Sequence, residues 1–331
     1  MKESEIRPQQ LFNRYLELSR RDIERFLSDR TRFKEVSCPA CGCEERKPGL
    51  VKFEFSYVLC ASCGSLYLSP RPTVEMYKYY YQEAESVKFW STHFYRETAE
   101  ARRQEIFKPR ALLVGEWAKK SGIKSNGEGL FVDIGSGYAI FLEEVRRLEL
   151  FGQIMGIEPE SNLAKVGRYR GFDIIEKRLE DIEDGEVGAD FATAFEVLEH
   201  AFNPLEFLGA ARRILRPGGI LMFTTLTVSG FDIQVLWENS KSVYPPHHIN
   251  LLSTQGMRDL VARSGLRLID LCTPGELDVD IVHNIQRENP AIQLPSFVAS
   301  IINAPDDVRT NFQNFLKANE LSSHIRVIGA R

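Results

Sequence analysis

Apolar runs of strand length alternate with segments of helical periodicity along the second half of the chain. The largely apolar run Leu130–Ile134 predicts a buried strand, and apolar residues recur at three- and four-residue spacings over 141–148 behind it. Further strands are expected at 153–158, 172–177, 189–195, 218–226, 266–272 and 324–330. This alternation predicts an α/β fold, with a parallel sheet that carries helices on both faces.

The first half of the chain predicts mainly helices. Residues 11–27 are amphipathic and are expected to pack on the body of the protein. Residues 70–82 are rich in tyrosine, and their prolines are expected to make an extended linker. A helix is predicted over 93–120, with a break or new start at Pro109. The turn-rich stretch that follows predicts a domain boundary at about residue 125.

Length and charge narrow the class of protein. The chain has 331 residues and a net charge of −4, so nothing in its charge favours a nucleic-acid partner. Its first ten residues lack the apolar core of a secretion signal, and no run reaches the roughly 18 apolar residues of a membrane helix. We therefore expect a cytoplasmic protein without membrane insertion.

Five of the six cysteines fall within one short segment. Cys38 and Cys41 form one C-x-x-C pair, Cys60 and Cys63 form another, and 18 residues separate the pairs. Without an export signal, such clustering indicates metal binding rather than disulfides. Four thiolates around Zn²⁺ make a closed structural site, with residues 51–60 as a strand between the pairs. Cys43 is a spare thiol or an alternative ligand.

The charge of this predicted zinc ribbon does not favour binding to the phosphates of a nucleic acid. Its basic and acidic side chains nearly balance between residues 31 and 75, whereas a nucleic-acid-binding ribbon is expected to be clearly basic. We expect a structural module that shapes a substrate cleft. The predicted organisation is an N-terminal helical segment, the ribbon, a helical connector and a main domain with a helical insertion that could form a cap: 1–36, 37–72, 73–125, 126–331 and, within the last, 273–323.

A glycine-rich turn follows the first predicted strand of the main domain. The stretch FVDIGSGYAIFL contains Asp133, Gly135, Ser136 and Gly137, at a strand-to-helix turn where a ligand can approach the backbone. The dinucleotide-binding fingerprint requires a small residue at position 140, where this chain has isoleucine. The turn instead spells D-x-G-x-G-x-A and resembles motif I of class I methyltransferases, which use S-adenosylmethionine (SAM).

Further motifs extend the resemblance. Glu158 lies 25 residues beyond Asp133, where a carboxylate can accept both ribose hydroxyls of an adenosine. The stretch AFEVLEH…RRILRPGG, which includes Glu196, is similar to a signature of the methyltransferase superfamily. The resemblance implies a Rossmann-like class I methyltransferase sheet, SAM as cofactor, and Glu180 or Asp181 near the adenine amino group.

The order of the modules also resembles a known family. A C-x-x-C ribbon, the methyltransferase core and then YPPHHINLLSTQGM are similar to bacterial zinc-ribbon methyltransferases, which are associated with sugar and polysaccharide biosynthesis. This implies transfer of a methyl group to a sugar nucleotide or another small glycan precursor. Two alternatives remain: an RNA methyltransferase whose ribbon binds the nucleic acid, and a non-catalytic SAM-binding protein whose Ala139 marks a degenerate core.

Histidines are the candidate bases for such a transfer. His200 follows the fourth predicted strand of the main domain, at the sheet edge where open α/β folds bind ligands, and Glu199 is a possible orienting partner. These two residues could instead begin the next helix or contact the cofactor. His247 and His248 lie in a proline-stiffened loop, where one can face the substrate while the other packs. A metal site with neighbouring acids is an alternative for them, although no ligand spacing supports it. The other histidines are expected to be structural: His93, His283 and His324.

Overall fold

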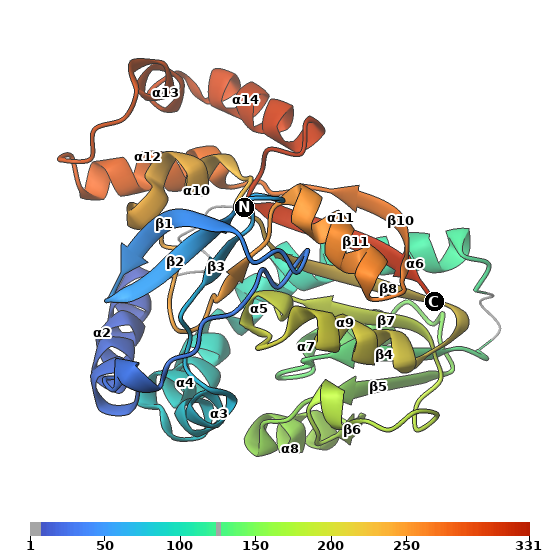
Figure 1. The fold of residues 1–331 in the computed structure, drawn as a ribbon. Helices are drawn as coiled ribbons and strands as arrows, with labels where there is room; N and C mark the ends of the chain where they lie inside the picture. Colours follow the sequence, from blue (N-terminus) through green and yellow to red (C-terminus); the bar gives the residue numbers. More distant parts are fainter. Residues whose placement is uncertain (1–7, 124–126) are drawn as a thin grey trace.

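A seven-stranded sheet forms the centre of the computed structural model, which describes residues 8–123 and 127–331. The strand order is β10-β11-β8-β7-β4-β5-β6, and only β11 runs antiparallel to its neighbours (Figure 1). Their bounds are β4 Leu130–Ile134, β5 Gln153–Ile157, β6 Asp173–Ile175, β7 Ala189–Phe195, β8 Leu215–Leu226, β10 Arg267–Cys272 and β11 His324–Ala330. The predicted α/β fold is confirmed. One detail differs: β8 begins before the Pro-Gly-Gly turn expected to launch it, and Gly218 inside β8 has φ +78°.

Helices cover both faces of this sheet. In β4, Phe131 packs with α6 Lys108–Lys120 and α7 Ile140–Arg146, whereas Val132 packs with α9 Pro204–Arg213 and α11 Thr254–Arg263 on the opposite face. Successive side chains of a strand point to opposite faces, so a strand that is apolar throughout must be covered on both. Helix α8, Ser161–Tyr169, joins the first of these layers through Ala164.

The cysteine segment folds onto the main domain through a second, antiparallel sheet. This sheet has the order β1-β2-β3-β9, and its last strand comes from the main domain. Its strands are β1 Arg46–Lys52, β2 Phe55–Cys60, β3 Leu66–Leu68 and β9 Asn250–Leu251. The single strand expected over 51–60 is therefore wrong, because Phe53 and Glu54 have φ of +48° and +63° and turn the chain into a hairpin.

Helical structure in the connector begins earlier than the helix predicted over 93–120. Only the start of the predicted linker 70–82 is extended, because the side chain of Thr73 caps α3, Val74–Glu83, by accepting a hydrogen bond from the backbone N–H of Met76. Helical structure then continues to Lys120, with Pro109 in the first turn of α6 as a new start. The intervening segments are α4 Glu85–Phe89, the π-helical η2 Trp90–Phe94, α5 Tyr95–Arg102 and the π-helical η3 Arg103–Phe107. The predicted boundary at about residue 125 lies outside the described residues.

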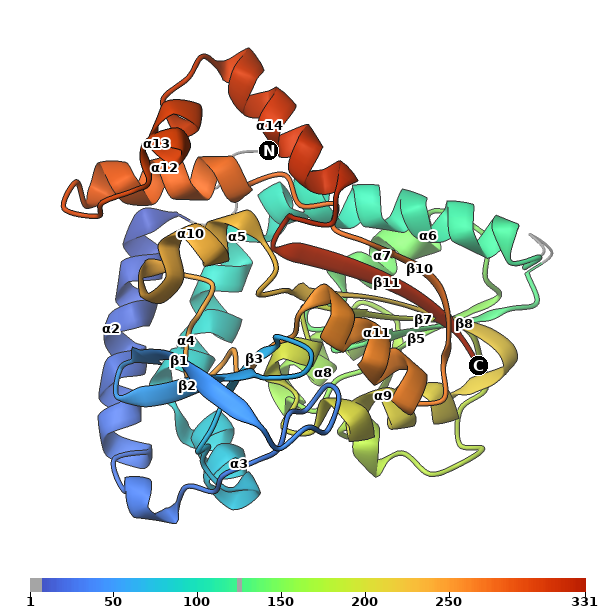
Figure 2. The same ribbon diagram turned by 45° about the horizontal axis from the view of Figure 1, so that its top comes forward.

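The N-terminal helix and the insertion before β11 complete the molecule. Helix α2, Gln9–Phe26, buries Phe12 and Tyr15 and packs beside the connector. The insertion is helical, as predicted, and its helices gather beside α10 (Figure 2). Helix α10 spans Phe231–Leu236, and the helices of the insertion are α12 Asp278–Glu288, α13 Ser296–Ile302 and α14 Asp306–Ala318. Since His324 pairs with Leu226 at the end of β8, the insertion emerges at the carboxyl edge of the parallel strands.

None of the described helices is both long enough and apolar enough to cross a lipid bilayer.

Candidate active site and metal centre

Four cysteines of the ribbon meet in one cluster. The Sγ atoms of Cys38, Cys41, Cys60 and Cys63 all lie within 4.8 Å of one another. The Cys38–Cys63 distance is 3.6 Å and the Cys41–Cys60 distance is 3.5 Å. A tetrahedral Zn²⁺ with bonds of about 2.3 Å holds its sulfurs about 3.8 Å apart, so this cluster fits a closed four-thiolate site.

Two glycine turns and one spare thiol surround this cluster. Gly42 and Gly64 follow the two cysteine pairs with φ of +81° and +73°, a region that favours glycine, and their N–H groups bond back to the carbonyls of Cys38 and Cys60. Cys43 lies outside the cluster, and its Sγ donates to the carbonyl of Glu45 at 3.7 Å. The geometry therefore leaves Cys43 as the spare thiol.

Buried polar contacts fasten the ribbon to the main domain. Arg71 is only 2% exposed, and it donates to the carbonyl of Phe202 at 2.9 Å and to Oδ1 of Asn250 at 3.3 Å. On the other side of the cluster, Ser253 at the start of α11 donates to the carbonyl of Cys63. The ribbon is thus bonded to the loops that follow β7 and β8.

The glycine-rich turn joins β4 to α7 and is open on one side. Gly135 and Gly137 have φ of +74° and +51°, and a Cβ on Gly137 would meet no atom within 4 Å. Ser136 Oγ is buried without a hydrogen-bond partner among the described residues. Ala139 also adopts a positive φ, +58°, which costs about 1 kcal/mol for a residue with a Cβ. The turn therefore forms with alanine, although glycine suits that position better.

Two buried carboxyl groups lie behind this turn. Asp133 accepts a hydrogen bond from Oγ1 of Thr193 at 2.7 Å, and burial raises the pKa of Asp133 to about 7. Glu158 follows β5 and accepts the backbone N–H groups of Gly137 and Glu160, each at 2.9 Å, while burial raises its pKa too. Glu158 thereby fixes the turn, and each of its oxygens keeps a further lone pair for a ligand.

The three other acids predicted to contact the cofactor have different surroundings. Glu180 lies in the short helix η4, Leu179–Asp181, and pairs with Arg178 at 3.2 Å, whereas Asp181 is exposed. Glu196 ends β7 with φ +56°, and its Oε1 is bonded by Arg110 at 2.8 Å and by His324 Nε2 at 2.6 Å. Burial raises the pKa of Glu196, but His324 and Arg110 outweigh that effect and hold it well below its usual range.

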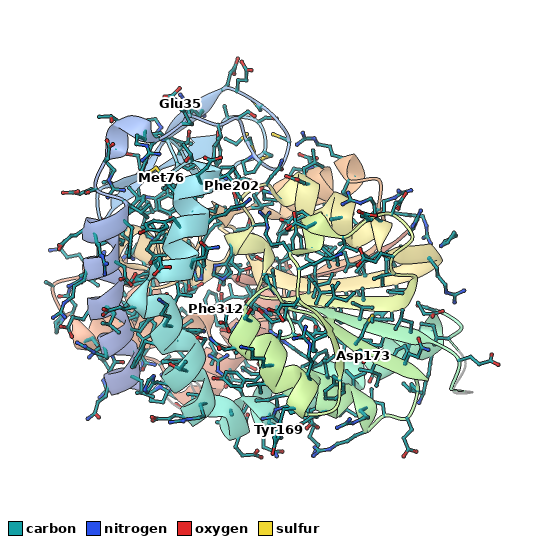
Figure 3. The ribbon with its side chains drawn as sticks, turned by 90° about the horizontal axis from the view of Figure 1, so that it is seen from below. Glu35, Met76, Tyr169, Asp173, Phe202 and Phe312 are labelled. Atoms are coloured by element: carbon teal, nitrogen blue, oxygen red, sulfur yellow. The ribbon has the colours of Figure 1, made fainter. Side chains whose placement is uncertain are left out.

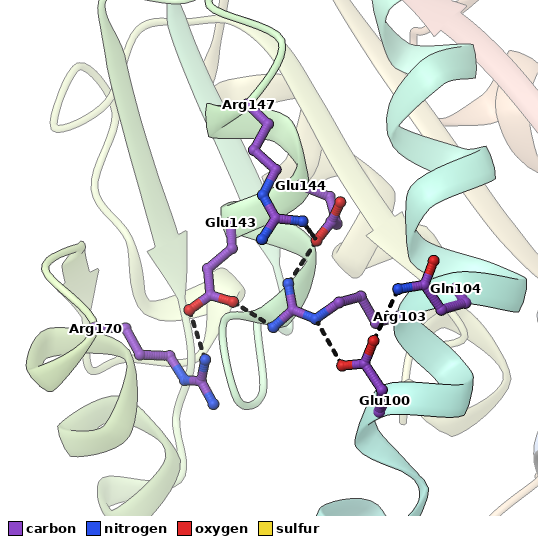
Figure 4. Close-up of polar contacts among 7 residues, drawn as sticks. All are labelled: Glu100, Arg103, Gln104, Glu143, Glu144, Arg147 and Arg170. Carbon is purple, nitrogen blue, oxygen red and sulfur yellow. Dashed lines mark hydrogen bonds and ion pairs between the residues drawn. The ribbon is translucent and has the colours of Figure 1, made fainter.

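An ion-pair network ties the connector to helix α7, directly behind the glycine turn (Figure 4). Arg103 of η3 contacts both Glu143 and Glu144 at 2.5 Å. Arg147 adds a second bond to Glu144 at 2.6 Å, and Arg170 adds one to Glu143 at 2.5 Å. Because Glu144 is only 4% exposed, its charge depends on these partners.

Glu199 and His200 occupy a single turn of 3₁₀ helix, η5 Leu198–His200, between β7 and α9. Glu199 is buried and accepts a hydrogen bond from Oγ1 of Thr225 at 2.7 Å. Burial and the nearby Glu196 raise the pKa of Glu199 to about 8. Burial and His248 lower the pKa of His200 to about 3, so its imidazole is neutral. Phe202 follows this turn and packs in the same hydrophobic cluster as Met76. The two labelled side chains lie close together in Figure 3.

The two histidines of the proline loop take different positions. His247 is buried, stacks on Tyr244 with ring centroids 5.9 Å apart, and meets Oη of Tyr80 at 3.1 Å. His248 lies with its ring centroid 5.0 Å from that of His200. Ligand atoms of Glu199, His200 and His248 all fall within 4.8 Å of one another. The structure thus brings together a cluster of Glu199, His200 and His248, the acceptor cluster, and leaves His247 packed behind it.

The acceptor cluster lies against the glycine turn. A Cβ on Gly135 would meet Cγ2 of Val197 at 2.9 Å, so the turn and the chain that leads into η5 are in direct contact. Parallel β4 and β7 are neighbours, which brings their carboxyl ends to one place. Both predicted halves of the site therefore share one edge of the sheet.

Sequence patterns missed three side chains at this edge. Arg110 and His324 hold Glu196, although no motif pointed to Arg110 and His324 was expected to be only structural. Tyr81 is half-buried, packs edge-on against His247, and has a buried Oη without a hydrogen-bond partner among the described residues. The only sequence signal for Tyr81 was the tyrosine-rich pattern of residues 77–81. This segment was expected to be an extended linker, so Tyr81 was not placed at the site.

Comparison with known proteins agrees with this geometry. Residues 98–271, just over half of the chain, match the family model described as a methyltransferase domain. A ubiquinone biosynthesis O-methyltransferase of Xanthomonas oryzae is 32% identical over 114 residues, covering 32% of this chain and 47% of that protein. Its counterpart in a Bradyrhizobium strain is 35% identical over 100 residues, covering 29% of this chain and 39% of the relative. The chain thus spans about half the length, or less, of the curated relatives it matches.

Solved structures resemble the chain only loosely. A Haloferax volcanii complex of the Trm112 methyltransferase activator with a methyltransferase matches at a TM-score of 0.48 and 16% identity, covering 73% of this chain and 95% of that one. A sarcosine dimethylglycine methyltransferase structure from Galdieria sulphuraria matches at a TM-score of 0.45 and 14% identity, covering 67% and 84%. The assignment rests on the family match and on the glycine turn. The chain belongs to the methyltransferase-domain family, with a class I, SAM-dependent domain on a Rossmann-like sheet.

Proposed function

We propose that the protein transfers a methyl group from SAM to a hydroxyl group of a small polar acceptor. The observation that carries this proposal is the contact between the open glycine turn and the chain segment that bears Glu199 and His200. A methyl donor held at the turn and an acceptor held at the acceptor cluster then lie next to each other. Such alignment supplies much of the rate enhancement in a displacement reaction, on the order of 7–11 kcal/mol in favourable cases.

The residues at the turn fit the cofactor. The unpartnered Oγ of Ser136 and the uncovered backbone of Gly137 offer a donor and space for close approach, and Glu158 offers carboxylate oxygens to a ribose. When bound, SAM supplies a methyl group on a positively charged sulfur. Ser136, Gly137 and Glu158 support this proposal by their position, and the cofactor roles of Asp133, Glu180, Asp181 and Glu196 remain predictions.

His200 is proposed to accept the proton of the acceptor hydroxyl. Its Nδ1 lies 3.0 Å from the carbonyl oxygen of His247, which can only accept, so the ring proton sits on Nδ1 and the lone pair on Nε2. Glu199 lies beside this ring and is held by Thr225, but the carbonyl of His247 occupies Nδ1, so the orienting role of Glu199 remains a prediction. A positioned base typically contributes about 10²–10⁴-fold to the rate.

A glycan precursor is proposed as the acceptor, with support from charge and from the sequence resemblance. The matched relatives named as O-methyltransferases support an oxygen acceptor. An RNA acceptor is disfavoured because the ribbon's charges nearly balance and three of its basic side chains are engaged within the protein: Arg46 pairs with Glu35, Lys52 donates to a backbone carbonyl, and Arg71 is buried. A purely SAM-binding role is the other alternative, and a His200→Ala variant that binds SAM but no longer transfers methyl groups would argue against it.

The test uses methyl-labelled SAM, the purified protein and an extract of its host, separated into RNA and small metabolites. We expect label in the sugar-nucleotide or precursor fraction, and label that ribonuclease releases would overturn the acceptor class. The His200→Ala variant should still bind SAM but transfer methyl groups about 10²-fold more slowly. His93→Ala, which changes an exposed histidine of η2, is the matched control.

A further inference from the structure

One carboxylate oxygen of Glu196 is held by three donors from three separate elements. Its Oε1 accepts hydrogen bonds from Arg110 of α6 at 2.8 Å, from Nε2 of His324 in β11 at 2.6 Å and from Oγ1 of Thr224 in β8 at 2.7 Å. In the part of the chain that the structure describes, no group bonds the other oxygen, Oε2, and the side chain is 38% exposed. The carboxylate is therefore anchored through one oxygen and open to the edge of the sheet through the other.

Glu196 and Glu199 are close in the chain but differ in charge at neutral pH. An arginine pairs with Glu196, whereas Glu199 is 2% exposed and accepts its side-chain hydrogen bond from the hydroxyl of Thr225. Burial and the charge of Glu196 raise the pKa of Glu199 to about 8, so Glu199 carries a proton. Acids whose pKa values are pushed apart by their surroundings take different roles. The negative charge beside the acceptor cluster is thus that of Glu196.

This negative charge acts on His200. Glu196 follows β7 directly, and His200 ends the next turn, where its backbone N–H bonds to the carbonyl of Val197 at 3.0 Å. Burial and His248 lower the pKa of His200, and the charge of Glu196 acts in the opposite direction. A buried imidazole that accepts a proton becomes a buried cation, which is costly unless a negative charge is near. Glu196 supplies such a charge.

We propose that Glu196 stabilises the positive charge that forms on His200 during methyl transfer, and that Arg110 and His324 are positioning residues that act through Glu196. The inference rests on the proposed function. In that reaction the acceptor oxygen bonds to the methyl carbon, the carbon–sulfur bond breaks with its electron pair going to sulfur, and the hydroxyl proton moves to Nε2 of His200. Glu196 takes no proton in this step. A charge that is already in place needs no reorganisation as the reaction proceeds, and this is what makes such stabilisation effective.

A carboxyl titration tests the role of Arg110 without any reaction. The ¹³C shift of the Glu196 carboxyl group, identified by its absence in Glu196→Gln, is followed in the full labelled chain between about pH 4 and 8. In Arg110→Met the pKa of Glu196 should be higher than in the wild type, because one opposing charge is gone and burial remains. Lys108→Met, at an exposed lysine of the same helix, should leave this pKa unchanged. A pKa of Glu196 that does not rise in Arg110→Met would overturn the positioning role.

His324 is tested by conservative replacement. His324→Leu removes a donor to Glu196 and should raise the pKa of that carboxyl group, whereas His324→Gln keeps a side-chain N–H and should reverse part of the rise. A thermal melt checks that both variants are folded. Equal pKa values of Glu196 in the two folded variants would overturn the role of His324.

Methyl transfer connects the carboxylate to His200. With methyl-labelled SAM and saturating amounts of the small-metabolite fraction of the host extract, Glu196→Gln should lower kcat by roughly 10–100-fold. The rate of Arg110→Met relative to wild type should fall as the pH is lowered from about 8 to 6, whereas this ratio should stay constant for Glu196→Gln. Calorimetry should show wild-type affinity of Glu196→Gln for SAM. An affinity that falls as much as the rate would place Glu196 at the cofactor and overturn the assignment.

The two proposals fail separately. The carboxyl titration uses the chain without SAM or acceptor, so its result does not depend on the reaction. A chain that transfers methyl groups while the pKa of Glu196 ignores Arg110 and His324 overturns only this inference. A chain that transfers methyl groups to no fraction overturns the proposed function, and the role of Glu196 toward His200 falls with it.

Discussion

Gly156 of β5 offers a sharp test of the cofactor site, because it supports the glycine turn without belonging to it. A Cβ at this position would lie 2.4 Å from Oγ of Ser136 and 2.8 Å from Cβ of Ser136 and Cδ1 of Ile174. Ordinary contacts fall at 3.4–4 Å, so Gly156→Ala must displace the turn or the neighbouring strand by roughly 1 Å. Such overpacking typically costs about 1–3 kcal/mol.

Stability and SAM affinity should both fall. For a domain of this size, that cost corresponds to a decrease in Tm of roughly 2–12 °C. A displaced Ser136 and Gly137 should weaken SAM binding by about 10–100-fold, equivalent to about 1–3 kcal/mol. Isothermal titration calorimetry with SAM and a thermal melt measure the two quantities. Gly209→Ala in α9 is the control, since a Cβ there meets no atom within 4 Å.

A double variant shows whether the contact with Ser136 causes the loss of stability. Ser136→Ala removes the Oγ contact but leaves the Cβ contact, so adding it to Gly156→Ala should restore part of the lost stability. Wild-type affinity in a Gly156→Ala chain whose stability Ser136→Ala partly restores would refute the placement of SAM at this turn. Unchanged affinity with a stability loss that Ser136→Ala does not relieve would show that the crowding falls on Ile174 instead.

Three further results are expected. Removing zinc with a chelator, followed by an activity assay and a SAM titration, should reduce methyl transfer more than SAM binding; equal losses would contradict this. Burial and Asp278 raise the pKa of Asp232 to about 8, so the wild-type protein loses stability as pH rises from 5 to 8, where the unfolded chain has already released this proton. Asp232→Asn removes this titration, so its free energy of urea unfolding relative to wild type should be more favourable at pH 8 than at pH 5 by on the order of 2 kcal/mol. Arg103→Met should cost about 3–5 kcal/mol because it leaves Glu144 buried with fewer partners, whereas Arg147→Ala, at an exposed arginine, should cost less; equal costs in the melts would contradict the network.

Local patterns predicted the sheet well, because its central strands β4, β7 and the second half of β8 are buried on both faces and so appear as largely continuous apolar runs. They failed where one residue decides a turn. Phe53 and Glu54 make the β1–β2 hairpin with positive φ, which neither residue type favours. The helix at Val74 was predictable in principle, since Thr73 is a good N-cap and the aromatic residues behind it recur at helical spacing.

The residues of the candidate site also differ in how well local sequence patterns predict their positions. Motif spacing is enough to place the residues at the glycine turn, because they lie in one short stretch and at the end of the neighbouring strand: Asp133, Gly135, Gly137 and Glu158. The surroundings of Glu196 are set by partners that are 86 and 128 positions away in the chain. Pairings over such separations depend on how the whole sheet folds, and a single sequence carries no local signal for them.

The ribbon matters to this site through hydrogen bonds rather than through its metal alone. Strand β3 pairs with β9, and Oη of Tyr57 in β2 donates to the carbonyl of His248 at 2.7 Å. Tyr77 of the connector donates likewise to the carbonyl of Pro246 at 2.8 Å. These bonds hold the loop that brings His248 to His200, whereas the glycine turn and Glu158 are held by β4 and β5. Loss of the ribbon fold should therefore release the acceptor side first and leave the cofactor side formed, which is why zinc removal is expected to separate methyl transfer from SAM binding.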